Sequence, residues 1–349
     1  MTRTFRTGAA DVGQIFHSRP IMASLHDVAR LAGVSKSTVS RVINDEYGVK
    51  DATKVKVRKA VEECGYLPNQ VAKDLKSQKT NLVGVIVPRV SSHATSQGVD
   101  GLTAVLEQAG KHVLLASTHQ THHKELEYIQ IFNQKRVEGI ILYATHLDNQ
   151  LVKSIQSSAV PVVLVGQDGS MFNIPSIVHD DNRVGFEAGN RLIAKGCKYM
   201  GFIGVQGDDI AVDKMRSEGF AQSLQFNDLT LQFHARGDFT IESGYQLAKQ
   251  SLKEHTQLDG LFCATDRIAI GAIRAIQEAG LVPGKDVLVL GVGDDELASV
   301  CTPTLSTFNY AFDKAGENGA KLLLDRIDKK GFEMSKMVLT FSTIERESC

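Results

Sequence analysis

Regular alternation of apolar and polar positions begins near residue 24, where two short helical patterns follow each other across a tight turn. Apolar residues lie at the i, i+3, i+4 and i+7 spacing of one helical face in the first pattern, and at i, i+3 and i+4 in the second. The first set is Leu25, Val28, Ala29 and Ala32, and the second is Val39, Val42 and Ile43. Gly33 stands between them, and glycine ends a helix in the left-handed conformation without steric cost. The pattern therefore predicts two short helices joined by a glycine turn.

Capping residues mark the ends of these helices and of a third one. Ser24 with Asp27 forms an N-terminal signature that is weaker than the usual Ser-x-x-Glu, and Ser35 can cap the second helix. For the third helix we expect Asp51 as its cap and Gly65 as its end. Its apolar stripe is Val57, Ala60, Val61 and Cys64. Two short helices braced by a third form a small all-α helix-turn-helix unit.

The outer face of the second helix carries the chemistry of this unit. Its outward residues are Lys36, Ser37, Ser40, Arg41 and Asn44. The second helix of a helix-turn-helix enters the DNA major groove. There Lys36 and Arg41 can donate hydrogen bonds to guanine edges, and short hydroxyl side chains can approach phosphates. From the residues alone, a three-helix bundle with a solvated polar face is the alternative.

From residue 81 onward, short apolar runs alternate with amphipathic helical segments. The runs are LVGVIV (82–87), HVLLAS (112–117), GIILYA (139–144), VPVVLV (160–165), YMGFIGV (199–205), GLFCA (260–264), VLVLGV (287–292) and MVLTFSTI (337–344). Continuous apolar strands joined by helices are typical of parallel sheets in α/β folds. Two sets of strands with a similar rhythm predict an α/β body of two similar parallel-sheet subdomains.

Polar residues directly follow most of these runs. They are Pro88–Ser91, Thr145–His146, Gly166–Asp168, Gln206–Asp209, Thr265–Arg267 and Gly293–Asp295. Ligands in open α/β sheets bind beyond the carboxyl ends of the strands, so these residues predict a pocket. Arginine forks and carboxylates suit a ligand dense in hydroxyl groups. Four aromatic residues can either stack on a sugar face or fill the core: Tyr143, Phe172, Phe308 and Tyr310.

Composition limits the cellular compartment and the classes of binding partner that are expected. The 349 residues, 42% of them hydrophobic, are more than one ordinary core needs, and no run of 18 apolar residues predicts a membrane span. Five scattered cysteines without a CxxC pair fit reduced thiols in the cytoplasm. Residues 23–80 hold 11 Lys/Arg and 7 Asp/Glu, whereas residues 81–349 hold 25 and 32. A basic head on an acidic body indicates that the head meets a polyanion, with ordinary charge scatter as the alternative.

The head motif is specific enough to suggest a family. DVARLAGVSKSTVSRVIN (27–44), followed by Tyr66–Asn69, closely resembles the lactose-repressor (LacI) family of bacterial transcription regulators, and the resemblance runs from Ala23 to the C-terminus. It implies a cytoplasmic, nucleoid-associated protein. It also implies that bases are read by Lys36, Ser37 and Arg41 and that phosphates are anchored by Thr38, Ser40 and Asn44. We expect the extension 1–22 to be an artefact of start-site choice, with a basic arm as the alternative.

The segment NQVAKDLKSQK (69–79) links the head to the body. Val71, Ala72 and Leu75 give it one small apolar face, which is too short for a stable free helix. The resemblance implies a hinge helix that folds against the same segment of a second subunit over the minor groove, with Leu75 as a wedge that kinks the duplex and Asn69 also at the DNA. A plain interdomain linker is the alternative. The predicted parts are 1–22, the head 23–68, the hinge 69–80, and an effector-binding and dimerisation body 81–349.

For the body, the resemblance implies a periplasmic-binding-protein-like arrangement whose chain crosses between subdomains near residues 180, 310 and 325. Arg216, in KMRSEGF, matches the family's effector-binding arginine. The other residues predicted to bind the effector are Arg89, Tyr143, Gln167, Asp266 and Asp294. This chain differs from many family members at three positions of the expected pocket, Arg89, Thr265 and Gly293. These departures leave the identity of the ligand open.

Two sugars fit these departures. Arg89 and the ATD at 264–266 look like the trehalose-repressor subgroup, whose ligand is a phosphorylated disaccharide, although there a second arginine stands at the position of Gln167. The stretch MASLHDVARLAGVSKSTVSRV (22–42) is similar to sucrose operon repressors. We therefore expect sucrose, or a product of its uptake such as sucrose phosphate or fructose, to induce a sugar-utilisation operon. Trehalose or its phosphate is the second candidate.

Other functions gain little support from the residues. His119, His122 and His123 lack a Cys or carboxylate that completes a metal site at short spacing, and paired carboxylates come without a nucleophile motif. We therefore expect no metal, no cofactor and no enzymatic activity. An exported sugar-binding transport module, the alternative of another class, needs a signal peptide and leaves the basic head unexplained. A palindromic double-stranded operator needs a two-fold dimer, and no heptad tail follows residue 344, so we expect a homodimer without a membrane partner.

Overall fold

The computed structural model describes residues 23–66, 80–207, 209–329 and 335–349. The chain separates into two units between Gln78 and Lys79, which we call the head and the body. The extension 1–22 and the hinge residues Asn69 and Leu75 lie outside the described residues, so what was predicted for them stays a prediction.

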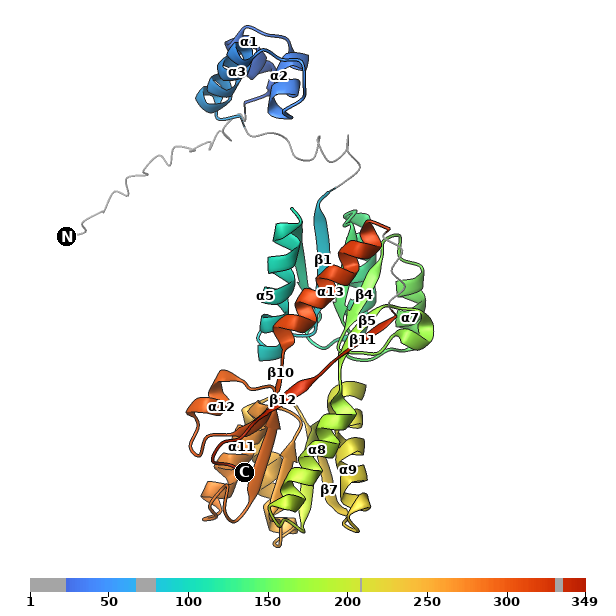
Figure 1. Cartoon of the computed structure of the whole chain (residues 1–349), viewed down its shortest axis with the longest axis vertical. Coiled ribbons are helices and arrows are strands. Elements are labelled where there is room, and N and C mark those ends of the chain that lie inside the picture. Colours follow the sequence, from blue (N-terminus) through green and yellow to red (C-terminus); the bar gives the residue numbers. More distant parts are fainter. Residues whose placement is uncertain (1–22, 67–79, 208, 330–334) are drawn as a thin grey trace, which may run out of the picture. The chain divides into compact units, whose positions relative to one another are not determined.

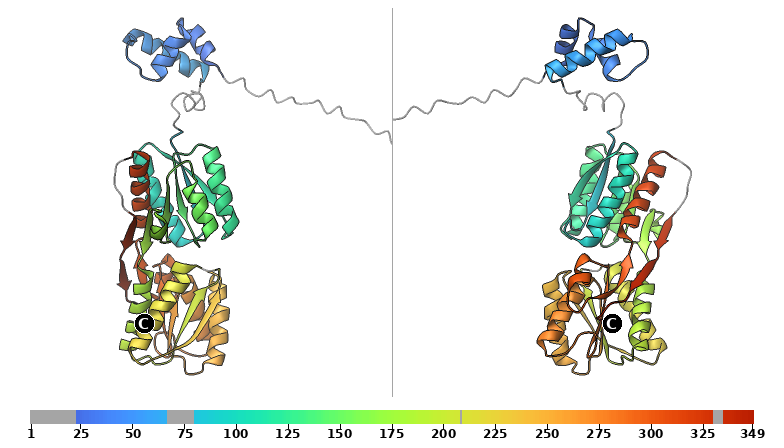
Figure 2. Two further views of the ribbon diagram at one scale, coloured as in Figure 1. Left: turned by 90° about the vertical axis from the view of Figure 1, so that its right-hand side faces the viewer. Right: turned by 60° about the vertical axis from the view of Figure 1, so that its left-hand side comes forward.

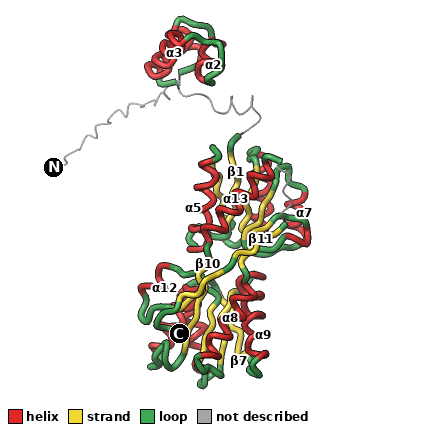
Figure 3. Tube along the Cα trace, in the orientation of Figure 1, coloured by secondary structure: helices red, strands yellow, loops and turns green. Residues whose placement is uncertain are grey.

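The described part of the head, residues 23–66, contains three helices around a small core. They are α1 (Leu25–Ala32), α2 (Lys36–Ile43) and α3 (Asp51–Cys64) (Figure 3). The buried side chains are Val28, Ala29, Val39, Val42, Val57, Ala60 and Tyr66. These residues include the apolar positions that set the predicted helical periods, so burying them against one another fixes how the three helices pack. The predicted all-α helix-turn-helix head is confirmed.

Local chemistry ends these helices largely as predicted. Ser24 and Asp27 form a reciprocal capping box on α1, and the Ser35 hydroxyl accepts a hydrogen bond from the Thr38 N–H at the start of α2. Gly33 ends α1 with φ of +65°. The prediction that Asp51 caps α3 is wrong: Lys50 holds the cap position, and Asp51 is already helical. A carboxylate in the first turn still interacts favourably with the helix dipole, which explains its position.

The body is built on two six-stranded sheets of matching topology (Figure 1). The first, with order β11-β5-β4-β3-β1-β2, is parallel throughout; in the second, with order β12-β10-β9-β8-β6-β7, only β12 runs antiparallel. The strands are β1 (Leu82–Val87), β2 (His112–Ser117), β3 (Gly139–Tyr143), β4 (Val162–Val165), β5 (Ser176–His179), β6 (Met200–Val205), β7 (Leu231–Gly237), β8 (Gly260–Cys263), β9 (Leu288–Val292), β10 (Ser306–Tyr310), β11 (Lys336–Leu339) and β12 (Phe341–Ile344). The predicted α/β body of two sheet subdomains is confirmed.

Helices cover both sheets. They are α5 (His93–Gln108), α6 (His122–Gln134), α7 (Asn149–Gln156), α8 (Asp181–Ala194), α9 (Arg216–Phe226), α10 (Ile241–Glu254), α11 (Asp266–Glu278), α12 (Glu296–Val300) and α13 (Phe312–Ile327), with single turns at Ser170–Phe172 and Ile210–Met215. In Figure 1, α13 lies beside α5 although more than 200 residues separate them in the chain. This packing is close because Gly316 has no side chain where it meets the Gly98 carbonyl of α5. The last long helix is therefore part of the first subdomain.

The described chain passes between the sheets at Asp180, at Ala311 and at Thr340. The third passage was expected near residue 325, and this is wrong because α13 and β11 both stay in the first subdomain. The apolar run 337–344, predicted as one strand, divides at Thr340: β11 pairs with β5, and β12 pairs with β10 (Figure 2). An extended segment can complete the edges of two sheets in turn, and alternation alone does not reveal the change.

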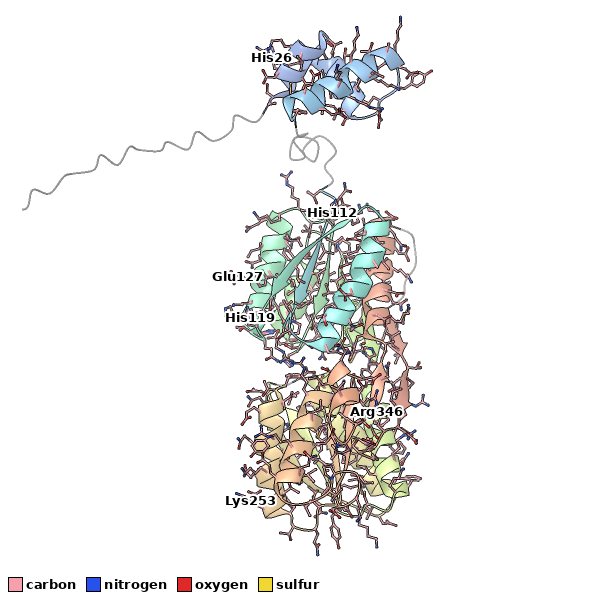
Figure 4. All side chains as sticks on the ribbon, turned by 90° about the vertical axis from the view of Figure 1, so that its left-hand side faces the viewer. His26, His112, His119, Glu127, Lys253 and Arg346 are labelled. Carbon is pink, nitrogen blue, oxygen red and sulfur yellow. The ribbon has the colours of Figure 1, made fainter. Side chains whose placement is uncertain are left out.

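The carboxyl ends of the strands meet where the two subdomains face each other. Figure 4 labels His112 at the start of β2 and His119 just beyond its end, and the second lies nearer the other subdomain. Large side chains hold the second sheet rigidly, above all the fully buried Phe202, Phe220, Phe262 and Phe308. The strand tips are thus rigid supports for the polar residues that follow them.

Candidate functional site

Two adjoining cavities lie in the body between the carboxyl ends of the two sheets. The larger encloses about 800 Å³ and the smaller about 640 Å³, partly open to solvent. The residues that line both include Arg89, Val212, Arg216, Phe239 and Phe312. Because both subdomains supply the walls, a ligand there contacts both of them.

Most of the predicted effector residues are brought together at these cavities. Arg89, Tyr143, Gln167 and Arg216 line the larger cavity, and Asp266 lines the smaller one. Asp294 does not line either cavity. Its carboxylate accepts hydrogen bonds from Arg346, 2.7 Å away and labelled in Figure 4, and from Asn309 at 2.9 Å.

The turn after β9 explains the displacement of Asp294. Gly293 and Asp294 both have positive φ, +132° and +53°, so the chain reverses there. This brings Asp295 to the cavity wall, where its carboxylate accepts a hydrogen bond from Arg267 at 3.1 Å. Asp295 therefore stands at the wall where Asp294 was expected.

Arg216 forms a buried ion pair at the boundary of both cavities. Nε and Nη2 of Arg216 lie 2.8 and 2.7 Å from Oδ1 of Asp181, and Nη1 donates to the Ala264 carbonyl. The Tyr310 hydroxyl donates to the same Asp181 oxygen at 2.9 Å, and its ring lies under the guanidinium. Burial raises the pKa of Asp181, although the charge of Arg216 opposes this shift. The arginine is thus held in one orientation by three groups of its own protein: the Asp181 carboxylate, the Ala264 carbonyl and the Tyr310 ring.

Gln167 and Asp209 join the two subdomains across the larger cavity. The Gln167 amide nitrogen donates to the Thr145 carbonyl at 3.0 Å and to Asp209 Oδ1 at 3.2 Å. The same Asp209 oxygen accepts the Val212 N–H at 3.0 Å and so caps the turn that leads to Arg216. Burial is the main reason that the pKa of Asp209 rises to about 6. A change in the protonation or identity of Asp209 therefore affects both the pocket wall and the hydrogen bond to Gln167 that joins the subdomains.

Asp266 holds the loop that follows β9 in place through hydrogen bonds. Its side chain is buried and accepts hydrogen bonds from the Thr307 hydroxyl at 2.5 Å and from the Asp295 N–H at 2.7 Å. Burial, with help from the negative charges of Asp294 and Asp295, raises the pKa of Asp266 to about 7. These contacts position Asp295 and its partner Arg267 at the smaller cavity.

Charged side chains of both signs line the smaller cavity: Arg89, Arg216 and Arg267 with Asp266 and Asp295. Arg89 is half-buried, lies over the Phe239 ring at 4.5 Å, and has no ion pair within the described part of the chain. Burial lowers the pKa of Arg89, and the nearby charge of Arg267 adds to this shift. Ser92, the N-cap of α5, makes no side-chain capping bond, and the residues around it line the same cavity. Arg216 and Arg267 are already paired with carboxylates, so the start of α5 and Arg89 are the groups at this cavity whose charge favours an anion.

Sequence reasoning missed several residues of the pocket wall, among them Phe239, His179, Asp181 and Phe312. Phe239 follows β7, whose sequence LQFHARG is too polar for a buried strand, and His179 ends β5, which is only four residues long. Of the aromatic residues considered as sugar platforms, Phe308 is fully buried in the core, Tyr310 lies under Arg216, and Phe172 is outside both cavities. Tyr143 lines the larger cavity, and Phe239 and Phe312 line both, so these aromatic residues are placed where a ligand can contact them.

In the head, the predicted DNA-reading residues lie on one helix and face outward. Lys36, Ser37, Arg41 and Asn44 are exposed, and Thr38 and Ser40 are half-buried. Within the described part of the head, neither Lys36 nor Arg41 has a carboxylate partner, so their donors are free for another molecule. The Ser35 hydroxyl lies 2.7 Å from that of Ser37 and 2.9 Å from that of Thr38, which orders the start of the helix.

Metal binding and membrane insertion find no structural basis in the described residues. No group of three or more His, Cys, Asp or Glu side chains there is arranged to hold a metal ion. His122, one of the three clustered histidines, instead lies 3.0 Å from Glu125 and 3.2 Å from Asp148. None of the helices described here has the length and apolar content to span a bilayer.

Comparison with known proteins matches both parts of the chain. The profile of bacterial regulatory proteins of the lacI family matches residues 24–69, and a periplasmic binding protein-like domain matches residues 190–349. The HTH-type transcriptional regulator RegA of Clostridium saccharobutylicum is 32% identical over 93% of this chain and 98% of its own. The sucrose operon repressor of Staphylococcus xylosus is 31% identical over 84% of this chain and 91% of its own. Among solved structures, the lac repressor dimer bound to operator and the anti-inducer ONPF superposes with a TM-score of 0.86 at 28% identity, covering 94% of this chain and 99% of the other.

Proposed function

The chain belongs to the lacI family of bacterial regulatory proteins, and from that premise we propose that it is a repressor which a sugar or sugar phosphate releases from its operator. Its relatives are transcriptional regulators, and so is this chain; it is not an enzyme. The observation that carries the proposal is the cavity between the two sheets, because both subdomains build its wall. A ligand that binds there more tightly in one closure of the subdomains shifts the protein toward that closure.

The head supplies the DNA-reading side of the proposal. Lys36 and Arg41 are exposed cationic donors of the kind that reads guanine edges in the major groove. Ser37 joins them at the bases. The proposed phosphate anchors are Thr38, Ser40 and Asn44. Asn69 and Leu75 are proposed to contact the minor groove when two hinge segments pair. A regulator of this kind acts in the cytoplasm, on the DNA of the nucleoid.

The pocket favours a ligand that combines hydroxyl groups with an anionic group. Arg89, Arg267 and the open start of α5 surround the smaller cavity, and these groups suit a phosphate. Gln167, Asp209 and Arg216 offer hydrogen-bonding groups for hydroxyls at the larger cavity. We therefore propose a sugar phosphate and rank sucrose phosphate ahead of free sucrose or fructose. The relative from Staphylococcus xylosus is a sucrose operon repressor, which supports a ligand derived from sucrose.

Trehalose 6-phosphate is the second candidate. Arg89 and the sequence Ala264–Asp266 resemble the trehalose-repressor subgroup, and Arg89 has no internal ion pair within the described residues that a phosphate would need to displace. Gln167 is neutral where that subgroup has an arginine, so a phosphate is held here by different groups.

The proposed assembly is a homodimer. The second subdomain exposes apolar side chains on α12, which contacts α11, and on the segment that follows α11: Leu281, Val282, Leu297 and Val300. Exposed apolar patches on a folded protein commonly mark interaction surfaces. A palindromic operator needs two heads related by two-fold symmetry, which a dimer supplies.

The experiment that tests the function measures the anisotropy of a fluorescent palindromic operator with the full-length protein. The titrants are sucrose, sucrose 6-phosphate, fructose, trehalose and trehalose 6-phosphate. We expect one phosphorylated sugar to lower operator affinity about tenfold or more, which is about 1.4 kcal/mol of coupling. If duplex binding is strong but no titrant changes it, the inducer proposal fails. If sugars bind and duplex DNA does not, the chain acts as a sugar-binding transport module instead.

A further inference from the structure

The wall of the larger cavity contains a histidine whose ring nitrogen lacks a partner. His179 is the last residue of β5 and lines the larger cavity. Its Nε2 atom is buried and has no hydrogen-bond partner within the described residues. Tyr143, which ends β3 on the same wall, has a hydroxyl group in the same condition. A buried polar atom without a partner costs about 1–3 kcal/mol, so two of them at one cavity call for an external partner.

The His179 ring is held in place by its neighbours. It stacks on the Tyr310 ring with centroids 4.3 Å apart and planes 10° from parallel, and the edge of Phe312 packs against it at 5.3 Å. Tyr310 is itself fixed by its hydrogen bond to Asp181. The imidazole therefore cannot swing out to solvent to find a partner for Nε2. Because His179 lines the larger cavity, a ligand can reach the ring from that side.

His179 is a neutral group beside a cationic one. Burial and the charge of Arg216 lower the pKa of His179 to about 3, so the imidazole is uncharged at physiological pH. A neutral imidazole offers one donor and one acceptor nitrogen, and a hydroxyl group can complement either. Arg267 lines the smaller cavity and Arg89 lines both, so negative charge is attracted where the two cavities adjoin. His179 and Tyr143 line the larger cavity and not the smaller one.

We infer that His179, assisted by Tyr143, is a specificity-determining residue that binds a ring hydroxyl of the effector and so sets the orientation of the ligand. The hydroxyl-bearing ring lies against His179 and Phe312, whose rings meet edge to face, and the anionic group lies at Arg89 and Arg267. The chemical class that fits is a polyhydroxylated ring with one charged substituent at its far end. This inference rests on the proposed role of the cleft as the effector site.

The test compares two histidine variants of the full-length protein by isothermal titration calorimetry. His179→Phe keeps an aromatic ring for the stack and removes the nitrogen, and His179→Asn restores a hydrogen-bonding group. His146→Phe is the matched control, because His146 lies in the same subdomain, also has a buried ring nitrogen without a described partner, and lines neither cavity. The probes are sucrose 6-phosphate, trehalose 6-phosphate and inorganic phosphate.

We expect His179→Phe to lower the affinity for the bound sugar phosphate, relative to that for inorganic phosphate, by about tenfold. His179→Asn should recover part of this loss, and His146→Phe should leave the ratio unchanged. An unchanged ratio in His179→Phe, or an equal loss for sugar phosphate and inorganic phosphate, overturns the inference. A wild-type protein that binds none of the probes overturns the proposed function, and the inference with it, and the wild-type titration distinguishes that case.

Discussion

The head and the body hold their functional side chains in opposite ways. In the head, Lys36 and Arg41 are exposed and have no ion pair within the described residues. In the body, Arg216 is buried and engaged by Asp181, Tyr310 and the Ala264 carbonyl. An exposed donor can meet a partner with little rearrangement, whereas a buried, fully engaged one has to exchange internal contacts for external ones. The body is therefore better suited to a switch than the head, because binding there has to replace internal contacts.

The contacts between the two subdomains make this difference concrete. The described links at the cavities include the hydrogen bond from Gln167 to Asp209 and the packing of Arg89 on Phe239. All four side chains line the cavity that a ligand would enter. A ligand can therefore replace contacts that hold the subdomains in one closure, which is the differential binding that a switch requires.

The largest predicted effect follows from the removal of Arg216, the buried arginine of the body. Arg216→Ala leaves the buried carboxylate of Asp181 without its partner, and breaking a buried pair costs about 3–5 kcal/mol of unfolding free energy. We also expect the response to sugar phosphate to disappear. Urea denaturation and operator anisotropy measure the two effects, with Arg274→Ala as control because its pair with Glu278 is largely exposed. A variant that still responds at wild-type ligand concentrations contradicts the assignment of the pocket.

A large effect of a different kind is expected in the head. Arg41→Ala should lower affinity for the specific operator by about 1–3 kcal/mol, because a bidentate contact to a base is lost. Ligand affinity should not change. Arg30→Ala is the control, since Arg30 is equally exposed but lies on α1 and pairs with Asp27. Equal losses on specific and random duplexes would mean that Arg41 binds phosphate rather than bases.

The pH dependence of stability sharpens the comparison further. The pKa of Asp209 is raised to about 6 by burial, from an ordinary value of 3.8. The folded state therefore holds this proton more tightly than the unfolded state does, so the contribution of Asp209 to stability falls as pH rises from about 4 to 6 and is most unfavourable above that range. Asp209→Asn keeps the Oδ1 acceptor for Gln167 and Val212. We expect it to raise the unfolding free energy by about 1–2 kcal/mol at pH 8 and to have little effect at pH 4.

Urea denaturation at pH 4 and pH 8 measures this difference. Asp238→Asn is the control because Asp238 is exposed, where a substitution usually changes stability by less than about 0.5 kcal/mol. If Asp209→Asn is less stable than the wild type at pH 8, the carboxylate is needed in its charged form and the expected sign is wrong.

The smallest predicted effect concerns the head alone. Ser24→Ala removes the hydroxyl of the capping box on α1 and should destabilise the head by about 1 kcal/mol. Hydrogen exchange in the full-length protein should show faster exchange of α1 amides and no change in the strands of the body. Lys59→Ala, on the exposed face of α3, serves as control. Faster exchange in the body as well would show that the two units do not unfold independently.

The difference between the head and the body also explains which features could be predicted from the sequence. In the head, the described helices depend on residues three or four positions apart, so their caps and apolar faces could be inferred locally. The exception is Asp51, which was predicted to cap α3 but is its first helical residue, one position after the true cap, Lys50. In the body, the apolar strands β1, β2 and β6 were evident as continuous runs. The pocket residues come from strand tips far apart in the chain, and only the rule about carboxyl ends united them.

The features that escaped prediction have physical reasons. β10 is rich in polar residues yet buried, because Ser306 bonds with the Arg346 carbonyl and Thr307 with Asp266, partners that are distant in sequence. The third passage between subdomains depends on two sheet edges that accept one extended run. Asp294 was misplaced because the direction of its side chain depends on the positive φ of the turn, which composition does not encode.

The most direct test of ligand-switched DNA binding is to measure the affinity of the effector sugar phosphate for the full-length protein with and without saturating operator DNA. Linkage requires that operator weakens ligand binding by the same factor by which ligand weakens operator binding. We predict a factor of about ten or more in both directions. Equal ligand affinity in the free and DNA-bound protein would contradict the proposal that the cavity controls the head.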